Sequence, residues 1–190
     1  MNSITPTILI VPGLREYVAN HWQTLLAAKL PKVRSVAPLE HEKLSCAARV
    51  DAIDSTLAAI DGPVIIVAHS AGAMMVAHWA SQRATRRVRG ALLAAPADLE
   101  TPMPAGYPTN DELKSHGWLP IPRAALPFPS IVAASSNDHL TRLERARDFA
   151  QAWGSRFVEL GAVGHLNPAS GYGAWPQAED FIHELSHANF

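Results

Sequence analysis

Three side chains that together could activate a serine lie far apart in the sequence: Ser70, Asp138 and His165. A serine hydroxyl is nearly inert at neutral pH, so its attack on a carbonyl requires a general base, an acid that orients the base, and donors for the developing oxyanion. Catalytic sets of a serine, an acid and a histidine are known to follow one another along a chain in the order serine, aspartate, histidine. We predict that Ser70 is the nucleophile, His165 its base and Asp138 the orienting acid.

The residues around Ser70 predict the sharp turn that a nucleophilic serine needs. The apolar run Pro63–Val67 is typical of a buried strand, and Ala71–Gln82 is typical of a helix. A serine between the two is lifted above the sheet edge, and its strained turn requires small residues two positions before and after it. Ala68 and Gly72 are small, with alanine standing where glycine is more usual.

Two other residues compete for roles in this site. His69 adjoins the serine, but successive side chains of an extended segment point in opposite directions, so we expect a structural role for it. Asp98 follows the predicted strand Gly90–Ala95 and is the alternative orienting acid. Asp98 stays open because some enzymes with such a set of residues place the acid one strand earlier, and Asp138 is preferred.

The loop after the first predicted strand contains the other half of the expected oxyanion site. Gly13 allows this loop to bend over the serine, and the backbone N–H groups of Leu14 and Ala71 would then form a two-donor oxyanion hole. The alternative is that Gly13 only makes a turn.

Candidate substrate-binding residues surround these loops. Six prolines between Pro96 and Pro129 disfavour a long helix there, and this segment follows the carboxyl end of a strand, where ligands bind in open parallel sheets. Tyr107, Trp118 and Phe128 either line the substrate rim or anchor the segment to the core. The predicted substrate-binding residues are Gly13, Arg15, Trp118 and His139.

Apolar runs separated by helical stretches predict an α/β fold with a mainly parallel sheet. The expected strands are Thr7–Val11, Val33–Val36, Val64–Ala68, Gly90–Ala95, Ser130–Ala134 and Arg156–Leu160. The expected helices are Asn20–Leu30, Ser45–Ile60, Ala71–Gln82, Thr141–Trp153 and Ala174–His187. A strand order of 2-1-3-4-5-6 in a three-layer α/β/α sandwich would open both the Gly13 loop and the Ser70 turn into one crevice.

Composition limits the function classes. The 190 residues, 48% of them hydrophobic, predict a single domain spanning residues 1–190. With a net charge of −1 the chain lacks the excess of positive charge that is typical of proteins that bind nucleic acid or an anionic membrane. The N-terminal residues lack a signal-peptide pattern, and Cys46 is the single cysteine, so we expect a soluble cytoplasmic protein. We find no metal-ligand or nucleotide-binding motif and expect no metal and no cofactor.

Several motifs resemble those of one small serine-hydrolase family, which includes retinoblastoma-binding protein 9 and bacterial relatives of the YdeN type. The resemblance spans nearly the whole chain. It rests on Pro12-Gly13 followed by His21-Trp22, on residues 69–72 (HSAG), on residues 135–138 (SSND), and on residues 164–167 (GHLN) followed by 170–176 (SGYGAWP). Pro12 departs from the histidine that often precedes the loop glycine in that family.

The resemblance implies a lidless α/β-hydrolase fold and a serine hydrolase that cleaves small esters or related acyl compounds through an acyl-enzyme on Ser70. The expected partner is a small acyl substrate. The alternative is a protein-binding or regulatory module that keeps the fold with little turnover, and a protein partner therefore stays possible.

Overall fold

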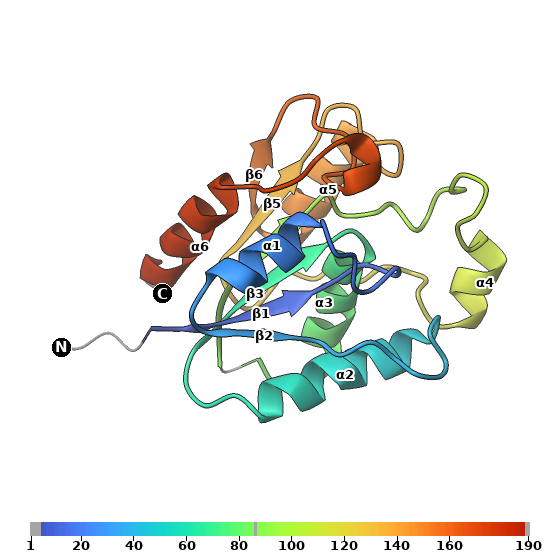
Figure 1. Cartoon of the computed structure of the whole chain (residues 1–190). Coiled ribbons are helices and arrows are strands. Elements are labelled where there is room, and N and C mark those ends of the chain that lie inside the picture. The colour runs from blue at the N-terminus through green and yellow to red at the C-terminus, as the bar shows by residue number, and fades with distance from the viewer. Residues whose placement is uncertain (1–4, 86, 189–190) are drawn as a thin grey trace.

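A six-stranded parallel sheet runs through the middle of the molecule and carries helices on both faces (Figure 1). The computed structural model describes residues 5–85 and 87–188. The first four residues of the N-terminal segment considered above lie outside the described residues. The strands are β1 (Thr7–Val11), β2 (Val33–Ser35), β3 (Val64–His69), β4 (Val88–Ala94), β5 (Ser130–Ala134) and β6 (Arg156–Glu159). The α-helices are α1 (Trp22–Lys29), α2 (Cys46–Ala58), α3 (Ala71–Gln82), α4 (Asn110–Ser115), α5 (Leu143–Trp153) and α6 (Gln177–His187).

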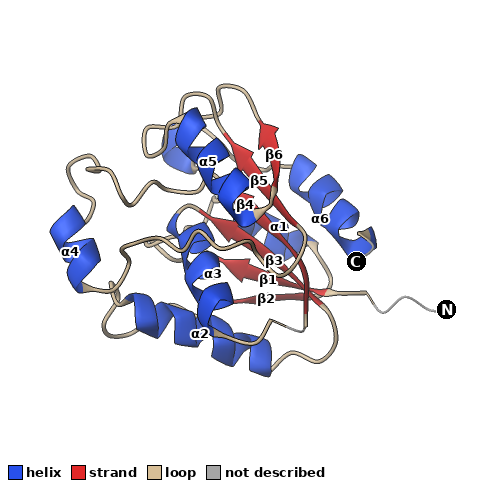
Figure 2. Ribbon diagram, turned by 180° about the vertical axis from the view of Figure 1, so that it is seen from behind, coloured by secondary structure: helices blue, strands red, loops and turns tan. Residues whose placement is uncertain are grey.

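Alternate residues of each central strand feed two separate cores. In β1, Leu9 and Val11 pack on one face, whereas Ile8 and Ile10 pack on the other. Because neither face of the sheet is left to water, both sets are apolar, as expected for a parallel sheet. Helices α2, α3 and α5 cover the first face, which is the near side in Figure 2, and α1 and α6 cover the second.

The strand order is β2-β1-β3-β4-β5-β6, and every pairing is parallel, so the predicted order is confirmed. The chain runs outward from β1 to one edge and then returns to build the other side from β3. The reversal lies between β1 and β3, which pair from Thr7 with Val64 to Val11 with Ala68. Loops after these two strands therefore meet at the carboxyl edge, where ligands bind in such sheets.

The proline-rich segment between β4 and β5 departs from the prediction in one respect. It contains a short helix, α4, which the sequence analysis does not anticipate. A capping box explains why it forms, because the Thr109 side chain accepts from the Glu112 N–H while the Glu112 carboxylate accepts from the Thr109 N–H. As expected, this segment has no long helix in its described residues.

None of the helices within residues 5–85 and 87–188 combines the length and the apolar character needed to cross a membrane.

Gly72 is required by the close approach of two chain segments. A Cβ atom there would lie 2.5 Å from the Val11 carbonyl oxygen and 2.7 Å from that of Pro12. We expect Gly72→Ala to lower the free energy of unfolding by about 1–3 kcal/mol, because backbone oxygens cannot rotate away from the added methyl group. Urea unfolding measures this change. Gly173→Ala is the control, since a Cβ at Gly173 meets no atom within 4 Å; equal stability of the two variants would contradict the explanation.

Candidate active site

Ser70 lies at the sharp turn between β3 and α3. Its backbone has φ 58° and ψ −129°, a conformation that non-glycine residues rarely adopt, and this is the strained turn that the sequence predicts. The turn is held because the Ser70 N–H donates to the Ala94 carbonyl on the neighbouring strand (3.0 Å). Helix α3 begins at the next residue, so its first N–H groups have no partner within the helix.

A continuous chain of hydrogen bonds joins the three predicted catalytic side chains. His165 Nε2 lies 2.8 Å from Ser70 Oγ, and His165 Nδ1 lies 2.7 Å from Asp138 Oδ2. The imidazole and the carboxylate are almost completely buried, with side chains 3% and 2% exposed. The structure therefore brings together three residues from the loops after β3, β5 and β6, in the arrangement by which a histidine can take a proton from a serine.

The loops that carry Asp138 and His165 are tied to each other. Asn137 Oδ1 accepts from the Gly164 N–H (2.7 Å) and from the Ser135 hydroxyl (2.8 Å). Ser135 Oγ in turn accepts from the Val163 N–H (3.1 Å). The Asp138 carboxylate is held separately, because its second oxygen accepts from the Leu140 N–H (2.9 Å). Thus the short SSND segment fixes both Asp138 and the loop that leads into His165.

His69 has the structural role that the sequence analysis expects. Its Nε2 lies 2.9 Å from the His165 carbonyl oxygen, which can only accept, so this nitrogen carries the hydrogen. Burial, followed by the nearby His165 and His21, holds the pKa of His69 well below its usual value. His69 therefore stays neutral and fixes the backbone of His165 rather than acting on Ser70.

A second buried histidine, His21, packs against His69 with ring centroids 4.5 Å apart. Its Nδ1 accepts from the Gln23 N–H (3.2 Å) and caps helix α1. Burial, with a smaller effect of His165, lowers the pKa of His21 to about 4. Within the described residues no group of three or more His, Cys, Asp or Glu side chains is arranged to hold a metal ion.

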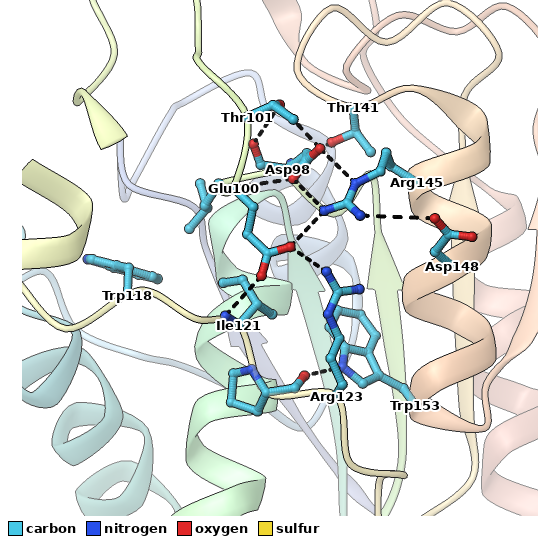
Figure 3. Close-up of polar contacts among 12 residues, drawn as sticks. Asp98, Glu100, Thr101, Trp118, Ile121, Arg123, Thr141, Arg145, Asp148 and Trp153 are labelled. Atoms are coloured by element: carbon cyan, nitrogen blue, oxygen red, sulfur yellow. Dashed lines mark hydrogen bonds and ion pairs between the residues drawn. The ribbon is translucent and has the colours of Figure 1, made fainter. Parts of the chain in front are cut away.

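Asp98, the alternative acid, is engaged elsewhere. Figure 3 shows its carboxylate facing Arg145 of α5, whose Nε and Nη2 donate to the two carboxylate oxygens at 2.9 and 3.2 Å. Arg145 also pairs with Glu100 (2.7 Å), which in turn binds Arg123. Asp98 is 2% exposed, and this pairing compensates the cost of burying its charge. Asp98 is therefore committed to Arg145, and the carboxylate that faces His165 is that of Asp138.

The Asp98 backbone also touches the loop that carries Asp138. The Asp98 N–H donates to Thr141 Oγ1 (2.7 Å) and to the Leu140 carbonyl (3.2 Å). The Thr141 hydroxyl donates onward to the Pro96 carbonyl (2.5 Å). Because the Leu140 N–H holds the Asp138 carboxylate, the segment after β4 positions Asp138 indirectly.

A cavity of about 130 Å³ opens beside Ser70. Its lining contains Ser70, His165 and four of the six residues expected near the oxyanion or the substrate: Gly13, Leu14, Arg15 and Ala71. Gly13 is more than a turn residue, because a Cβ there would lie 3.1 Å from the Cβ of Ser70. The absence of a side chain lets the β1 loop approach the serine.

The remaining predicted substrate-binding residues separate into two groups. Tyr107 lines the Ser70 cavity, and His139 lines an adjoining cavity with its ring centroid 5.7 Å from that of His165. Trp118 corrects the prediction: its side chain is 0% exposed, its Nε1 donates to the Leu44 carbonyl (2.6 Å), and it does not line the Ser70 cavity. Trp118 and the buried Phe128 are core anchors of the proline-rich segment.

Sequence reasoning did not identify Gln23. Its side-chain amide donates to the carbonyls of Val11 (3.2 Å) and Val67 (3.0 Å), so it ties the ends of β1 and β3 together beside the cavity. Its 3% exposure is unusual for glutamine, but only the fold shows that the amide reaches two strands.

Comparison with known proteins agrees with this geometry. A model of the serine hydrolase family matches residues 8–184. The chain belongs to this family. Membership of this family supports hydrolase activity. A comparison with curated proteins found no match.

Solved structures share the fold of this chain. A YdeN-like hydrolase from Pectobacterium atrosepticum is similar with a TM-score of 0.78 and 29% identity, covering 95% of this chain and 90% of that chain. The ydeN gene product of B. subtilis has a TM-score of 0.70 and 17% identity, with coverage of 95% and 98%. Mouse alpha/beta hydrolase domain-containing protein 10 has a TM-score of 0.70 and 15% identity, with coverage of 97% and 92%. The serine hydrolase has the α/β-hydrolase fold, and it is of the small YdeN type that the sequence motifs resemble.

The two buried histidines predict how stability depends on pH. Because their folded-state pKa values are lowered, the unfolded chain takes up protons below pH about 6.5 that the folded chain does not. The free energy of unfolding should therefore fall as pH decreases from about 6.5, by up to about 1.4 kcal/mol per pH unit for each group. For His21 this loss ends near its folded pKa of about 4.

Urea unfolding of the wild type and His69→Gln at a series of pH values between neutrality and pH 5 tests this dependence. Glutamine keeps a donor but cannot titrate, so the variant should lose less stability than the wild type over the same range. Parallel losses in the two proteins would show that His69 does not contribute.

Proposed function

We propose that this serine hydrolase cleaves small esters or related acyl compounds through an acyl-enzyme on Ser70. The observation that carries the proposal is the hydrogen-bonded chain from Ser70 Oγ through both ring nitrogens of His165 to Asp138. No requirement of the fold explains why these three side chains meet at one edge of the sheet.

In the first half of the proposed reaction, Ser70 Oγ attacks the carbonyl carbon while His165 Nε2 takes the hydroxyl proton. Asp138 accepts from Nδ1–H, which keeps Nε2 free to act as a base and stabilises the imidazolium that forms. The tetrahedral intermediate collapses when the alkoxide leaves with the proton from Nε2, and the acyl group stays on Ser70.

In the second half, water takes the place of the alcohol. His165 removes a proton from water, the hydroxide attacks the acyl carbon, and Ser70 leaves with that proton. We propose that the backbone N–H groups of Leu14 and Ala71 stabilise the oxyanion in both halves, since both residues line the cavity beside Ser70. The cavity of about 130 Å³ supports a short acyl group.

The proposal is tested with an ester, a thioester and an amide that share one short acyl chain. We expect saturable turnover of at least the ester, and Ser70→Ala should lower kcat by about a thousandfold or more, because the nucleophile and base act as a unit. Ser136→Ala is the matched control, since Ser136 is exposed on the neighbouring loop.

Turnover that survives in Ser70→Ala would contradict the proposal. Folded wild-type protein that turns over none of the three substrates, but binds a protein partner, would favour the alternative of a binding module.

The contacts of Thr141 predict that this residue influences turnover although it does not touch the reacting atoms. Thr141→Val removes the hydroxyl that bonds Asp98 and Pro96, so the loop that holds Asp138 loses a constraint. We expect kcat to fall severalfold with little change in KM, together with a stability loss of about 1–3 kcal/mol for the unpaired buried groups. Thr141→Ser keeps the hydroxyl and should restore kcat.

Arg123→Gln distinguishes a loss of positioning from a loss of stability. Arg123 pairs with Glu100, which binds Arg145 beside Asp98, but Arg123 does not touch the Asp138 loop. The variant should lower stability without changing kcat at a temperature where the protein is folded. A matching loss of kcat in Arg123→Gln would show that Thr141 acts only through stability.

A further inference from the structure

The cavity beside Ser70 has an uneven distribution of charge. Among its lining residues Arg15 is the only lysine or arginine, and Glu16 is the only carboxylate. The rest of the wall is largely apolar and includes Leu14, Leu99, Met103 and Leu140. Such a wall suits a short carbon chain, and the charged residues then decide what the end of that chain carries.

The negative charge of Glu16 is satisfied within the protein. Its Oε1 accepts from the Leu39 N–H (2.8 Å) and faces the Arg49 guanidinium (3.5 Å), while its Oε2 lies 3.9 Å from Lys43 Nζ. The Glu16 side chain is 11% exposed. It is therefore engaged by two cations and does not offer a free carboxylate to a ligand.

Arg15 is different, because no ion pair to it occurs within residues 5–85 and 87–188. Its side chain is exposed, and its guanidinium carbon lies 5.3 Å from the ring centroid of Tyr107. Two histidines of the same lining, His21 and His69, do not add positive charge at neutral pH, since burial lowers the pKa of His21 to about 4 and that of His69 well below its usual value. The cavity thus carries one uncompensated permanent charge, and that charge is positive.

A row of rings connects Arg15 with the reacting histidine. Tyr107 lies edge to face with His139 (6.4 Å between centroids), and His139 lies edge to face with His165 (5.7 Å). The Arg15 guanidinium lies over the Tyr107 ring, and this cation–π contact does not use its N–H donors, which match the geometry of a carboxylate. Tyr107 therefore holds Arg15 at the rim of the cavity in a form suited to binding an anion.

We infer that the substrate of the proposed hydrolysis carries a carboxylate, which Arg15 binds while the ester group lies at Ser70. The inference rests on the proposed function. The substrate class is a short ester with one free carboxylate, on the acyl side as in a half-ester of a dicarboxylic acid, or on the alcohol side as in an acylated hydroxy acid. Arg15 determines specificity and takes no part in the proton transfers.

The test uses two matched pairs of esters. For the acyl side, the mono-4-nitrophenyl ester of glutaric acid is compared with the same compound in which the free carboxylate is converted to a methyl ester. Release of nitrophenol is measured for both. For the alcohol side, 3-acetoxybenzoate is compared with its methyl ester, and release of acetate is measured. For each pair the result is the ratio of kcat/KM, anionic over neutral, corrected for the spontaneous hydrolysis of each compound.

We expect the wild type to prefer the anionic member of at least one pair, and the pair that shows the preference identifies the side of the ester that carries the carboxylate. Arg15→Gln should lower that ratio by about tenfold or more, mainly through KM, since a charge-assisted pair of hydrogen bonds is lost. Arg15→Lys should restore only part of it, because an ammonium group cannot bind a carboxylate with two parallel bonds.

Arg89→Gln is the control for net charge, because Arg89 is exposed near the amino end of β4, at the opposite edge of the sheet. Its ratio should equal that of the wild type. A preference for the neutral member in both pairs, or an unchanged ratio in Arg15→Gln, would overturn the inference while leaving ester hydrolysis intact. Failure of the proposed function is distinguishable, since Ser70-dependent turnover would then be missing for the neutral esters as well.

Discussion

The hydrogen bond between His165 Nε2 and Ser70 Oγ is the interaction on which the rest of this structure depends. It joins residues 95 positions apart at 2.8 Å, and a displacement of about 1 Å costs such a pair much of its effect. Two features of the fold meet this demand. The reversal of strand order between β1 and β3 brings the Gly13 loop to Ser70, and the carboxyl ends of β5 and β6 bring Asp138 and His165 to the same edge.

Placing His165 so accurately requires buried polar groups, and each of those described above has a hydrogen-bond or ion-pair partner. His69 holds the backbone of His165, Leu140 holds the carboxylate of Asp138, and Asn137 joins the two loops. Arg145 compensates the buried charge of Asp98 behind them. Because an unpaired buried polar group is costly, breaking any of these contacts would be unfavourable, and together they hold the two loops in place.

The sequence predicts most of the framework because the signals are local. Continuous apolar runs define the six strands, and the small residues around Ser70 define its turn, so strand order and the serine, aspartate and histidine positions follow from pattern and chain order. The failures concern side chains whose surroundings come from distant segments. Trp118 is an aromatic residue in a loop near the ligand edge, yet it is buried against His78 of α3 and donates to the Leu44 carbonyl, and nothing in its neighbours along the chain indicates this. The partner of Asp98 is likewise 47 residues away, and Gln23 reaches two strands that only the fold brings together.

The central claim is that His165 makes Ser70 a nucleophile, and the rate at which a fluorophosphonate modifies Ser70 tests it most directly. Peptide mass analysis locates the label in the wild type, in His165→Ala and in His183→Ala, which changes an exposed histidine on α6. The account predicts labelling of Ser70 in the wild type and in His183→Ala at the same rate, and labelling slower by about a hundredfold or more in His165→Ala. Equal rates in His165→Ala and the wild type, or a label on another residue, would contradict it.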